Sequence, residues 1–179
     1  MRTRNLFLRW TLLLSLLLSV PAAGRSWLGA FFSPKATGIS SVSSVGTGEA
    51  AFVQADLLLD MNGVYRAWND SPGLQLRVAA DYVIVRGALA TGTTLSWMAG
   101  PGLMFGYVSD SDNVFGFSGS VTAGTSLMFD FLRKVGIVLS FSADMGLHYS
   151  RSDGHPVMRS YRNGYFRAYY PELRLLYQF

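Results

Sequence analysis

The chain contains no cysteine, which excludes disulfide bonds, a thiolate nucleophile and any metal site built on thiolate ligands. Lysine is almost missing as well, since it occurs only at Lys35 and Lys134. A soluble domain of this size would cover its outer surface with Lys, Glu and Arg. The chain therefore has too little lysine for the outer surface of a typical soluble domain.

Long apolar runs and helical periodicity are also missing beyond residue 24. Instead, apolar residues alternate with small or polar ones, most clearly in segments 114–130 and 135–150. Both segments exceed the five or six residues usual for a strand in a globular sheet. They are long enough for tilted membrane strands, which need about nine to eleven residues. The pattern predicts an all-β chain.

Residues 1–24 have the three parts of a secretory signal peptide. Basic Arg2, Arg4 and Arg9 precede the apolar run 11–20, and small residues fill 21–24. We expect cleavage after Gly24, which leaves residues 25–179 as one domain. Its net charge is near +1 rather than the +4 of the full chain, because the leader holds three arginines and no acid. This charge gives no argument for a nucleic-acid partner.

Alternation does not say which face of a strand points outward, because a lipocalin-like barrel also alternates, with its apolar side inward. The polar faces here consist of Ser, Thr, Gly and a few charged residues, which suits a crowded lumen. The apolar faces are aromatic at both ends and aliphatic between, which suits lipid with aromatic girdles. The sequence therefore predicts a transmembrane antiparallel up-and-down β-barrel.

Turn signals predict the number of strands. We expect eight of them, because a single-chain bacterial barrel has an even number, at residues 27–35, 50–59, 64–69, 74–86, 94–108, 114–130, 135–150 and 165–179. The short third strand follows Asn62-Gly63, a strong hairpin signal. Periplasmic turns are expected at 60–63, 87–93 and 131–134. Outer loops are expected at 36–49, 70–73, 109–113 and 151–164.

The last strand has one apolar face, formed by Leu173, Leu175, Tyr177 and Phe179. It resembles the C-terminal assembly signal of outer-membrane β-barrel proteins. The whole chain resembles the small eight-stranded outer-membrane proteins, such as the X and W types and the transmembrane domain of outer membrane protein A. The resemblance implies a monomer in the bacterial outer membrane, in contact with lipid, lipopolysaccharide and the barrel-assembly machinery. It transfers no specific activity, because no motif of any one family matches.

Several charged residues are expected to point into the lumen, which in an eight-stranded barrel is only wide enough for side chains. These residues are Asp56, Arg66, Arg77, Asp81, Asp130, Asp144, Glu172 and Arg174. Charge pairs that satisfy a buried interior are one interpretation. A narrow solute path or a metal site is the other, and no spacing selects it. We predict no metal and no cofactor.

His148 and Ser150 form the one pair that could carry chemistry, since a hydroxyl beside an imidazole is a minimal acyl-transfer pair. His-x-Ser late in such a barrel resembles the outer-membrane lipid A 3-O-deacylase. The chain departs from that family because Arg151 replaces an Asn, and Asp153 and Glu172 are poorly spaced acidic partners. The register also turns His148 toward the lumen. We therefore expect a protein that is not an enzyme.

The loop 151–164 carries Arg151, Arg159 and Arg162 against one acid, Asp153. Guanidinium groups bind phosphate with two hydrogen bonds, so lipopolysaccharide is a possible partner of this loop. Solvated charges that keep the loop soluble are the alternative. The expected function is envelope integrity or surface contact through the outer loops. A narrow channel for small solutes is the alternative function.

Overall fold

The structure is a computed structural model that describes residues 24–46, 48–61, 72–109, 115–152, 155–160 and 170–179. For residues 109, 115, 150–152, 155–160 and 170 it describes the backbone alone. The strands are β1 Ser26–Phe32, β2 Ala36–Val45, β3 Ala51–Asp60, β4 Gly73–Ala90, β5 Thr93–Ser109, β6 Phe115–Phe131, β7 Val135–Ser152, β8 His155–Ser160 and β9 Tyr170–Gln178. In these residues no helix has the length and apolar character to cross a membrane.

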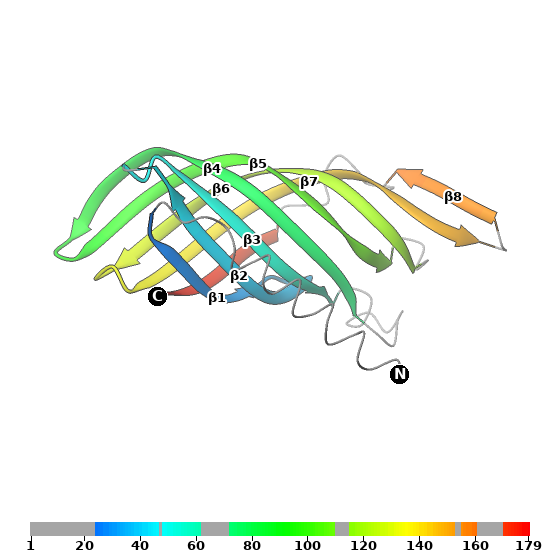
Figure 1. The fold of residues 1–179 in the computed structure, drawn as a ribbon, viewed down its shortest axis with the longest axis horizontal. Coiled ribbons are helices and arrows are strands. Elements are labelled where there is room, and N and C mark those ends of the chain that lie inside the picture. The colour runs from blue at the N-terminus through cyan, green and yellow to red at the C-terminus, as the bar shows by residue number, and fades with distance from the viewer. Residues whose placement is uncertain (1–23, 47, 62–71, 110–114, 153–154, 161–169) are drawn as a thin grey trace.

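Eight of the strands close a barrel (Figure 1). Each strand from β1 to β6 pairs antiparallel with the next, β7 pairs with β9, and β9 returns to β1. β8 lies outside this ring and pairs with the outer part of β7 as a hairpin. The predicted eight-stranded, antiparallel, up-and-down barrel is confirmed.

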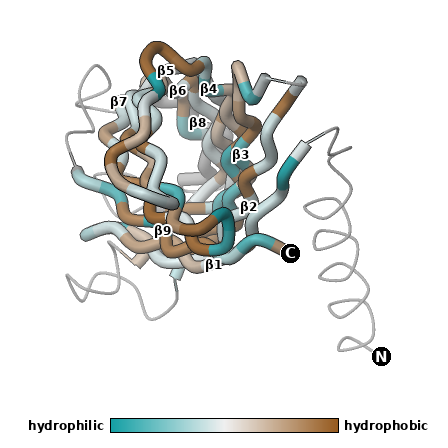
Figure 2. Tube along the Cα trace, turned by 90° about the vertical axis from the view of Figure 1, so that its left-hand side faces the viewer, coloured by the Kyte–Doolittle hydropathy of each residue, from teal (hydrophilic) through white to brown (hydrophobic). Residues whose placement is uncertain are grey.

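Side chains alternate between the outside and the inside of the barrel along the strands, except at the register irregularities of β4. On β7, Leu139 and Phe141 are 41% and 52% exposed, whereas Val138 and Ser140 are 0% and 4% exposed. Figure 2 shows the ring of strands around the lumen, with hydrophobic and hydrophilic positions alternating along the trace. Large apolar side chains lie outside on all eight strands of the ring, so the polar faces line the lumen, as the sequence predicts.

The barrel has two different ends. The terminal end carries the last residues of β9 and the short turns β2–β3, β4–β5 and β6–β7. Hydrogen bonds join these features, from Leu132 N to Gly92 O at 2.6 Å and from Gln178 N to Lys134 O at 2.8 Å. The loop end carries the turn 33–35 and the connections β3–β4, β5–β6 and β7–β9 (Figure 1).

The second strand of the barrel was not predicted. Residues 36–45, expected to lie in an outer loop, form β2 between β1 and β3. Serines occupy both faces of this strand, at Ser40, Ser41, Ser43 and Ser44, so its alternation signal is weak. The strand expected at 64–69 lies outside the described residues. β2 is thus one of the eight strands of the ring, and the predicted total of eight was right.

Because β2 was not predicted, two connections lie at the opposite end of the barrel from the one expected. Asp60 lies at the loop end, where it pairs with Ala36 and Gly73, so the connection at 60–63 is not on the same side as the turn 131–134. The end of the expected outer loop, residues 46–49, instead forms a turn at the terminal end. Because neighbouring strands run in opposite directions, the insertion of β2 reverses the side of the connections that directly follow it.

Other predicted boundaries change as well. β1 stops at Phe32, because Ser33 Oγ accepts hydrogen bonds from Ala36 N at 2.9 Å and Lys35 N at 3.3 Å and forms a tight turn. β4 continues to Ala90, four residues into the predicted turn 87–93. The predicted loop 151–164 contains the end of β7 and the whole of β8, and β9 begins at Tyr170.

The new β2–β3 pairing can be tested with cysteines, since the native chain has none. Ile39 and Leu57 are register partners, and paired Cα atoms in an antiparallel ladder are within disulfide range. The double variant Ile39→Cys/Leu57→Cys should form a disulfide under mild oxidation, visible as a mobility shift that a reductant reverses. The matched pair Ile39→Cys/Val53→Cys is offset by four residues and should stay reduced. Efficient cross-linking of the offset pair would contradict this register.

Candidate functional site: the filled barrel interior

An apolar layer spans the lumen in the terminal half of the barrel. Every strand of the ring contributes one residue to it, and these are Trp27, Val42, Phe52, Val83, Met98, Met128, Val138 and Leu176. All except the partly buried Val83 are at most 3% exposed. The ring centroids of Trp27 and Phe52 are 6.0 Å apart in a tilted arrangement. The layer leaves the two ends of the lumen separated by packed side chains.

A central ionic cluster of Asp56, Arg77, Glu172 and Arg174 lies on the loop side of this layer. Asp56 is fully buried and accepts hydrogen bonds from both arginines. Its Oδ2 lies 2.7 Å from Arg77 Nη2 and 3.0 Å from Arg174 Nη2. Glu172 is the second acceptor, with Oε1 2.7 Å from Arg77 Nη1 and Oε2 3.3 Å from Arg174 Nη2. Each guanidinium therefore bridges two carboxylates.

Aromatic and hydroxyl groups complete the cluster. The ring of Phe31 faces both guanidinium groups, with Arg77 Cζ 5.1 Å and Arg174 Cζ 5.0 Å from its centroid. Both distances fall within the range of cation–π attraction. Ser140 accepts a hydrogen bond from Arg174 Nη1 at 2.7 Å, and Ser142 donates one to Glu172 Oε1 at 2.8 Å. These partners satisfy groups whose charge would otherwise be costly to bury.

Asp81 extends the cluster with a third carboxylate. It accepts hydrogen bonds from the Gln54 amide and from Ser126 Oγ, which in turn bonds Ser140 at 3.1 Å. Asp56, Asp81 and Glu172 thus face two guanidinium groups in one buried region. Buried ion pairs of this kind hold the geometry of an interior, and removal of one partner is more costly than the pair itself is stabilising.

A second ionic group lies at the terminal end of the lumen. Arg25 bonds Glu49 through its Nε and Nη2, and its Nη1 lies 2.6 Å from Asp130 Oδ2. Arg86 pairs with the same Glu49. The hydrogen bonds from Arg25 lower the pKa of the Glu49 carboxyl below its ordinary value, and the same bonds raise the pKa of the Arg25 guanidinium. This group ties β1, β4, β6 and the β2–β3 turn together.

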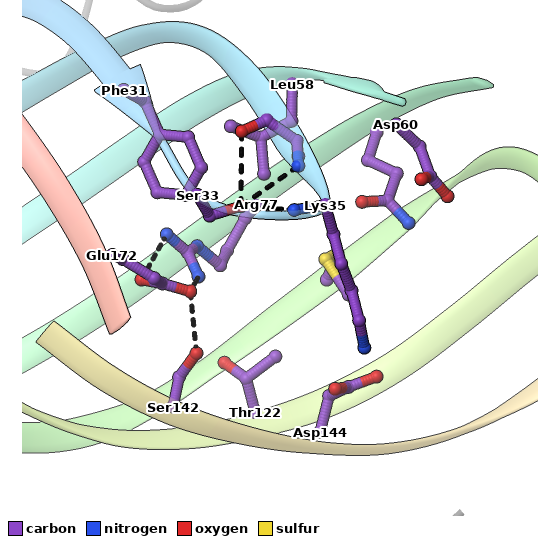
Figure 3. A pocket seen from close by; sticks show the side chains of 13 residues that line it. Phe31, Ser33, Lys35, Leu58, Asp60, Arg77, Thr122, Ser142, Asp144 and Glu172 are labelled. Carbon is purple, nitrogen blue, oxygen red and sulfur yellow. Dashed lines mark hydrogen bonds and ion pairs between the residues drawn. The ribbon is translucent and has the colours of Figure 1, made fainter. Parts of the chain in front are cut away.

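A cavity of about 90 Å³ lies between the central ionic cluster and the loop end (Figure 3). Arg77 and Glu172 form its floor, next to Phe31. Polar side chains from β4, β6 and β7 form its sides, and Lys35 extends across it from the β1–β2 turn. The cavity is roughly large enough for a few water molecules or a very small solute.

The structure brings together five of the predicted lumen charges, namely Asp56, Arg77, Asp81, Glu172 and Arg174. Two others lie apart from them. Asp130 is on the far side of the apolar layer, beside Arg25, and Asp144 lines the cavity. Arg66 lies outside the described residues.

The sequence reasoning missed the terminal ionic group and the apolar layer. Arg86 was difficult to place because β4 has a register irregularity between Val83 and Val85, which breaks the two-residue alternation. Val138 interrupts the otherwise small and polar face of segment 135–150, and such an interruption is the signal that an apolar layer crosses the lumen. The same kind of interruption occurs at Met98 and Leu176.

His148 is fully buried inside the barrel, and its Nε2 lies 3.0 Å from Val108 O. Ser150 pairs with Gly116 in the β6–β7 ladder, and its side chain lies outside the described part. The same holds for Arg151, which pairs with Pro156, for Arg159, which pairs with His148, and for Arg162. On β9, Leu175, Tyr177 and Phe179 are exposed on the outer face, with Leu173 partly exposed beside them.

Comparison of the chain with protein-family models, with curated proteins and with solved structures gives no match. In the described residues, no group of three or more His, Cys, Asp and Glu side chains is placed to hold a metal ion. The geometry of the barrel and its interior is therefore the basis for any functional conclusion.

The central ionic cluster should be essential for stability. Arg174→Met leaves Asp56 and Glu172 buried with one guanidinium fewer, and we expect a loss of about 3–5 kcal/mol in the free energy of unfolding. Urea unfolding of the refolded barrel in detergent would measure it. Arg133→Met, on an exposed turn, is the matched control and should change this free energy by less than about 0.5 kcal/mol. Equal effects of the two substitutions would refute the importance of the cluster.

The terminal ionic group predicts a pH dependence of stability. The pKa of Glu49 is lowered in the folded protein, so its contribution is present above the unfolded pKa of about 4.3 and is lost as the pH falls through the folded value. The unfolding temperature of the parent should therefore be higher than that of Glu49→Gln at pH 7. The two unfolding temperatures should converge toward pH 3.

Arg86→Gln is the control for this experiment. Arg25 contributes most to the lowered pKa of Glu49, so Arg86→Gln should keep most of the acid-dependent loss of stability. A difference between parent and Glu49→Gln that stays constant from pH 7 to pH 3 would show that ionisation of Glu49 does not stabilise the fold.

Proposed function

We propose that this protein is a membrane-embedded barrel of the bacterial outer membrane with a closed lumen and no enzymatic activity. It acts in envelope integrity or surface contact through its loop end. The observation that carries the proposal is the apolar exterior. Exposed large apolar side chains lie on every strand of the ring, at exposures such as 58% for Leu103 and 51% for Met145. A soluble monomer rarely exposes so continuous an apolar surface.

Aromatic residues at the two ends support a membrane position. Tyr107, Phe117 and Tyr149 are register partners in one outward row near the loop end. Phe129 is an outward-facing aromatic toward the terminal end of β6. The twelve steps of β6 between Phe117 and Phe129 rise about 40 Å at 3.3 Å per residue, or about 30 Å along the barrel axis at a tilt near 40°. That separation matches the hydrocarbon core of a bilayer.

The apolar layer and the ionic cluster favour a closed barrel over a channel. A solute path would have to cross the layer that all eight strands form, where Trp27, Val42, Met98 and Val138 are completely buried. Separating packed apolar side chains and a network of buried ion pairs is too costly for rapid passage.

The position of His148 argues against an outer-membrane deacylase. A lipid substrate would approach from the outer face of the barrel, whereas His148 is fully buried inside. The proposal therefore has no catalytic residue. We therefore expect the function to depend on contacts made by the surface and the ends of the barrel.

The loop end is the part proposed to make contacts. The β7–β8 hairpin extends beyond the other strands of the barrel (Figure 1). Its backbone carries Arg151 and Arg159, which would meet phosphate groups of lipopolysaccharide at the membrane surface. The outward residues of β9 would be recognised by the barrel-assembly machinery.

Fluorescent labels on single cysteines in reconstituted vesicles test the membrane position. Labels at Leu139→Cys and Phe141→Cys should be quenched by a lipid-attached quencher, because these positions face outward on β7. Labels at Gly136→Cys and Gln178→Cys, on the inward face near the terminal end, are the matched controls and should be quenched far less. The opposite order would place the polar face against lipid and refute the proposal.

The same vesicles test the closed lumen. The parent protein should give no ion conductance above that of protein-free bilayers, while a general porin prepared in the same way conducts. Stable single-channel currents from the parent would exclude a closed barrel, although they would leave the membrane position intact.

A further inference from the structure

The turn between β6 and β7 is built from residues that are unusual for its backbone geometry. Leu132 and Arg133 occupy its two central positions with φ angles of 51° and 55°, and Lys134 N donates a hydrogen bond to Phe131 O at 3.0 Å. Positive φ at both central positions is the pattern of a type I′ turn, which prefers Asn and Gly and disfavours other side chains. The turn therefore keeps Leu132 and Arg133 at a cost in stability, which indicates a use for their side chains.

These side chains are directed to the surroundings of the barrel. Leu132 is 74% exposed, and Arg133 and Lys134 are exposed as well. Among the residues that the structure describes, neither of these two cations has an ion pair or a side-chain hydrogen bond. Arg86 at the same end of the barrel is different, because it pairs with Glu49. The turn therefore presents one apolar side chain and two cations that the described fold does not use.

The turn lies at the terminal end (Figure 1), where lipid headgroups would be in the proposed membrane position. In that position Phe129 marks the edge of the hydrocarbon core, and its ring stacks on that of Phe131, with centroids 6.5 Å apart. Leu132 follows Phe129 by three residues, which is about 10 Å along a strand or about 8 Å along the barrel axis at a tilt near 40°. The headgroup region extends about 5–8 Å beyond the core, and long arginine and lysine side chains can reach into it.

We infer that the β6–β7 turn binds the phosphate groups of anionic phospholipids in the leaflet at the terminal end. The Arg133 guanidinium can bind a phosphate with two hydrogen bonds, and the Lys134 ammonium adds a compact positive charge. Leu132 would enter the apolar margin of the headgroup region beside Phe131. An anionic lipid is favoured over a zwitterionic one because its headgroup has no cation of its own to compensate the phosphate. The inference rests on the proposed membrane position and adds a lipid contact at the end opposite to the β7–β8 hairpin.

Electron spin resonance of spin-labelled lipids tests the inference on the full chain in phosphatidylcholine vesicles. Spin-labelled phosphatidylglycerol should associate with the protein about fivefold more strongly than spin-labelled phosphatidylcholine at low salt. This preference should fall at high salt, where the charges are screened. Immobilised phosphatidylcholine by itself reports insertion into the bilayer. Equal association of the two lipids would refute the inference and leave the membrane position intact, whereas the absence of any immobilised lipid would refute both.

Substitutions in the turn separate lipid binding from folding. Leu132→Asn/Arg133→Gly places preferred residues at the two positions with positive φ, so this variant should unfold at a higher urea concentration than the parent. Its preference for phosphatidylglycerol should nevertheless fall to about twofold or less, because one cation is lost. Arg86→Gln is the matched control, since it removes a cation that is already paired with Glu49 at the same end, and it should keep the preference of the parent. An unchanged preference in the Asn-Gly variant, or an equal loss in Arg86→Gln, would overturn the assignment to this turn.

Discussion

Closure of the hydrogen-bonded ring is the constraint on which the rest of this structure depends. In the proposed membrane position the apolar outer surface would face lipid, where no water could satisfy an unpaired backbone N–H or C=O group. β9 therefore pairs with both β7 and β1, and the described ring has no free edge. Once the ring is closed, the position of each side chain follows from its place in the ladder. A slip by one residue would exchange the two faces of a strand.

The bulge in β4 changes which side chains of this strand point into the lumen of the closed ring. Val83 pairs with Met98 and Val85 pairs with Trp97, so one extra residue is inserted between them. Val83 contributes to the apolar layer, and beyond the bulge Arg86 reaches Glu49 inside the terminal end. Without the extra residue, alternation would direct Arg86 to the outer face. The bulge thus places an apolar residue and a charged residue, three positions apart, on the same side.

Filling the lumen requires two kinds of packing because its inward residues differ along the axis. Near the terminal end they are large and apolar and form one layer. Toward the loop end many are Ser, Thr or Gly, which leave room for the long side chains of Arg77 and Arg174. Gly102 illustrates this crowding, since a Cβ there would come within 2.6 Å of Thr122 Oγ1. The apolar layer and the central ionic cluster together separate the cavity at the loop end from the terminal end.

The alternation, the scarcity of lysine and the length of the segments predicted the all-β barrel and the outward position of residues such as Leu139. These features are local, because a strand's two faces can be seen in its own sequence. The inward position of Asp56, Arg77 and Arg174 followed from the same periodicity. By contrast, β2 was hidden, since serines on both of its faces give no alternation, and only its pairing with β1 and β3 makes it a strand.

The partners inside the lumen were decided by the tertiary structure alone. Asp56 and Arg174 are 118 positions apart in the chain, and Arg25 and Asp130 are 105 apart. Their contacts depend on strand order, on the stagger of neighbouring strands and on the bulge in β4, none of which has a signature in one strand's sequence. The cavity is likewise formed by residues of all eight strands of the ring. Sequence periodicity determined which way each side chain points, whereas closure of the ring decided what it meets there.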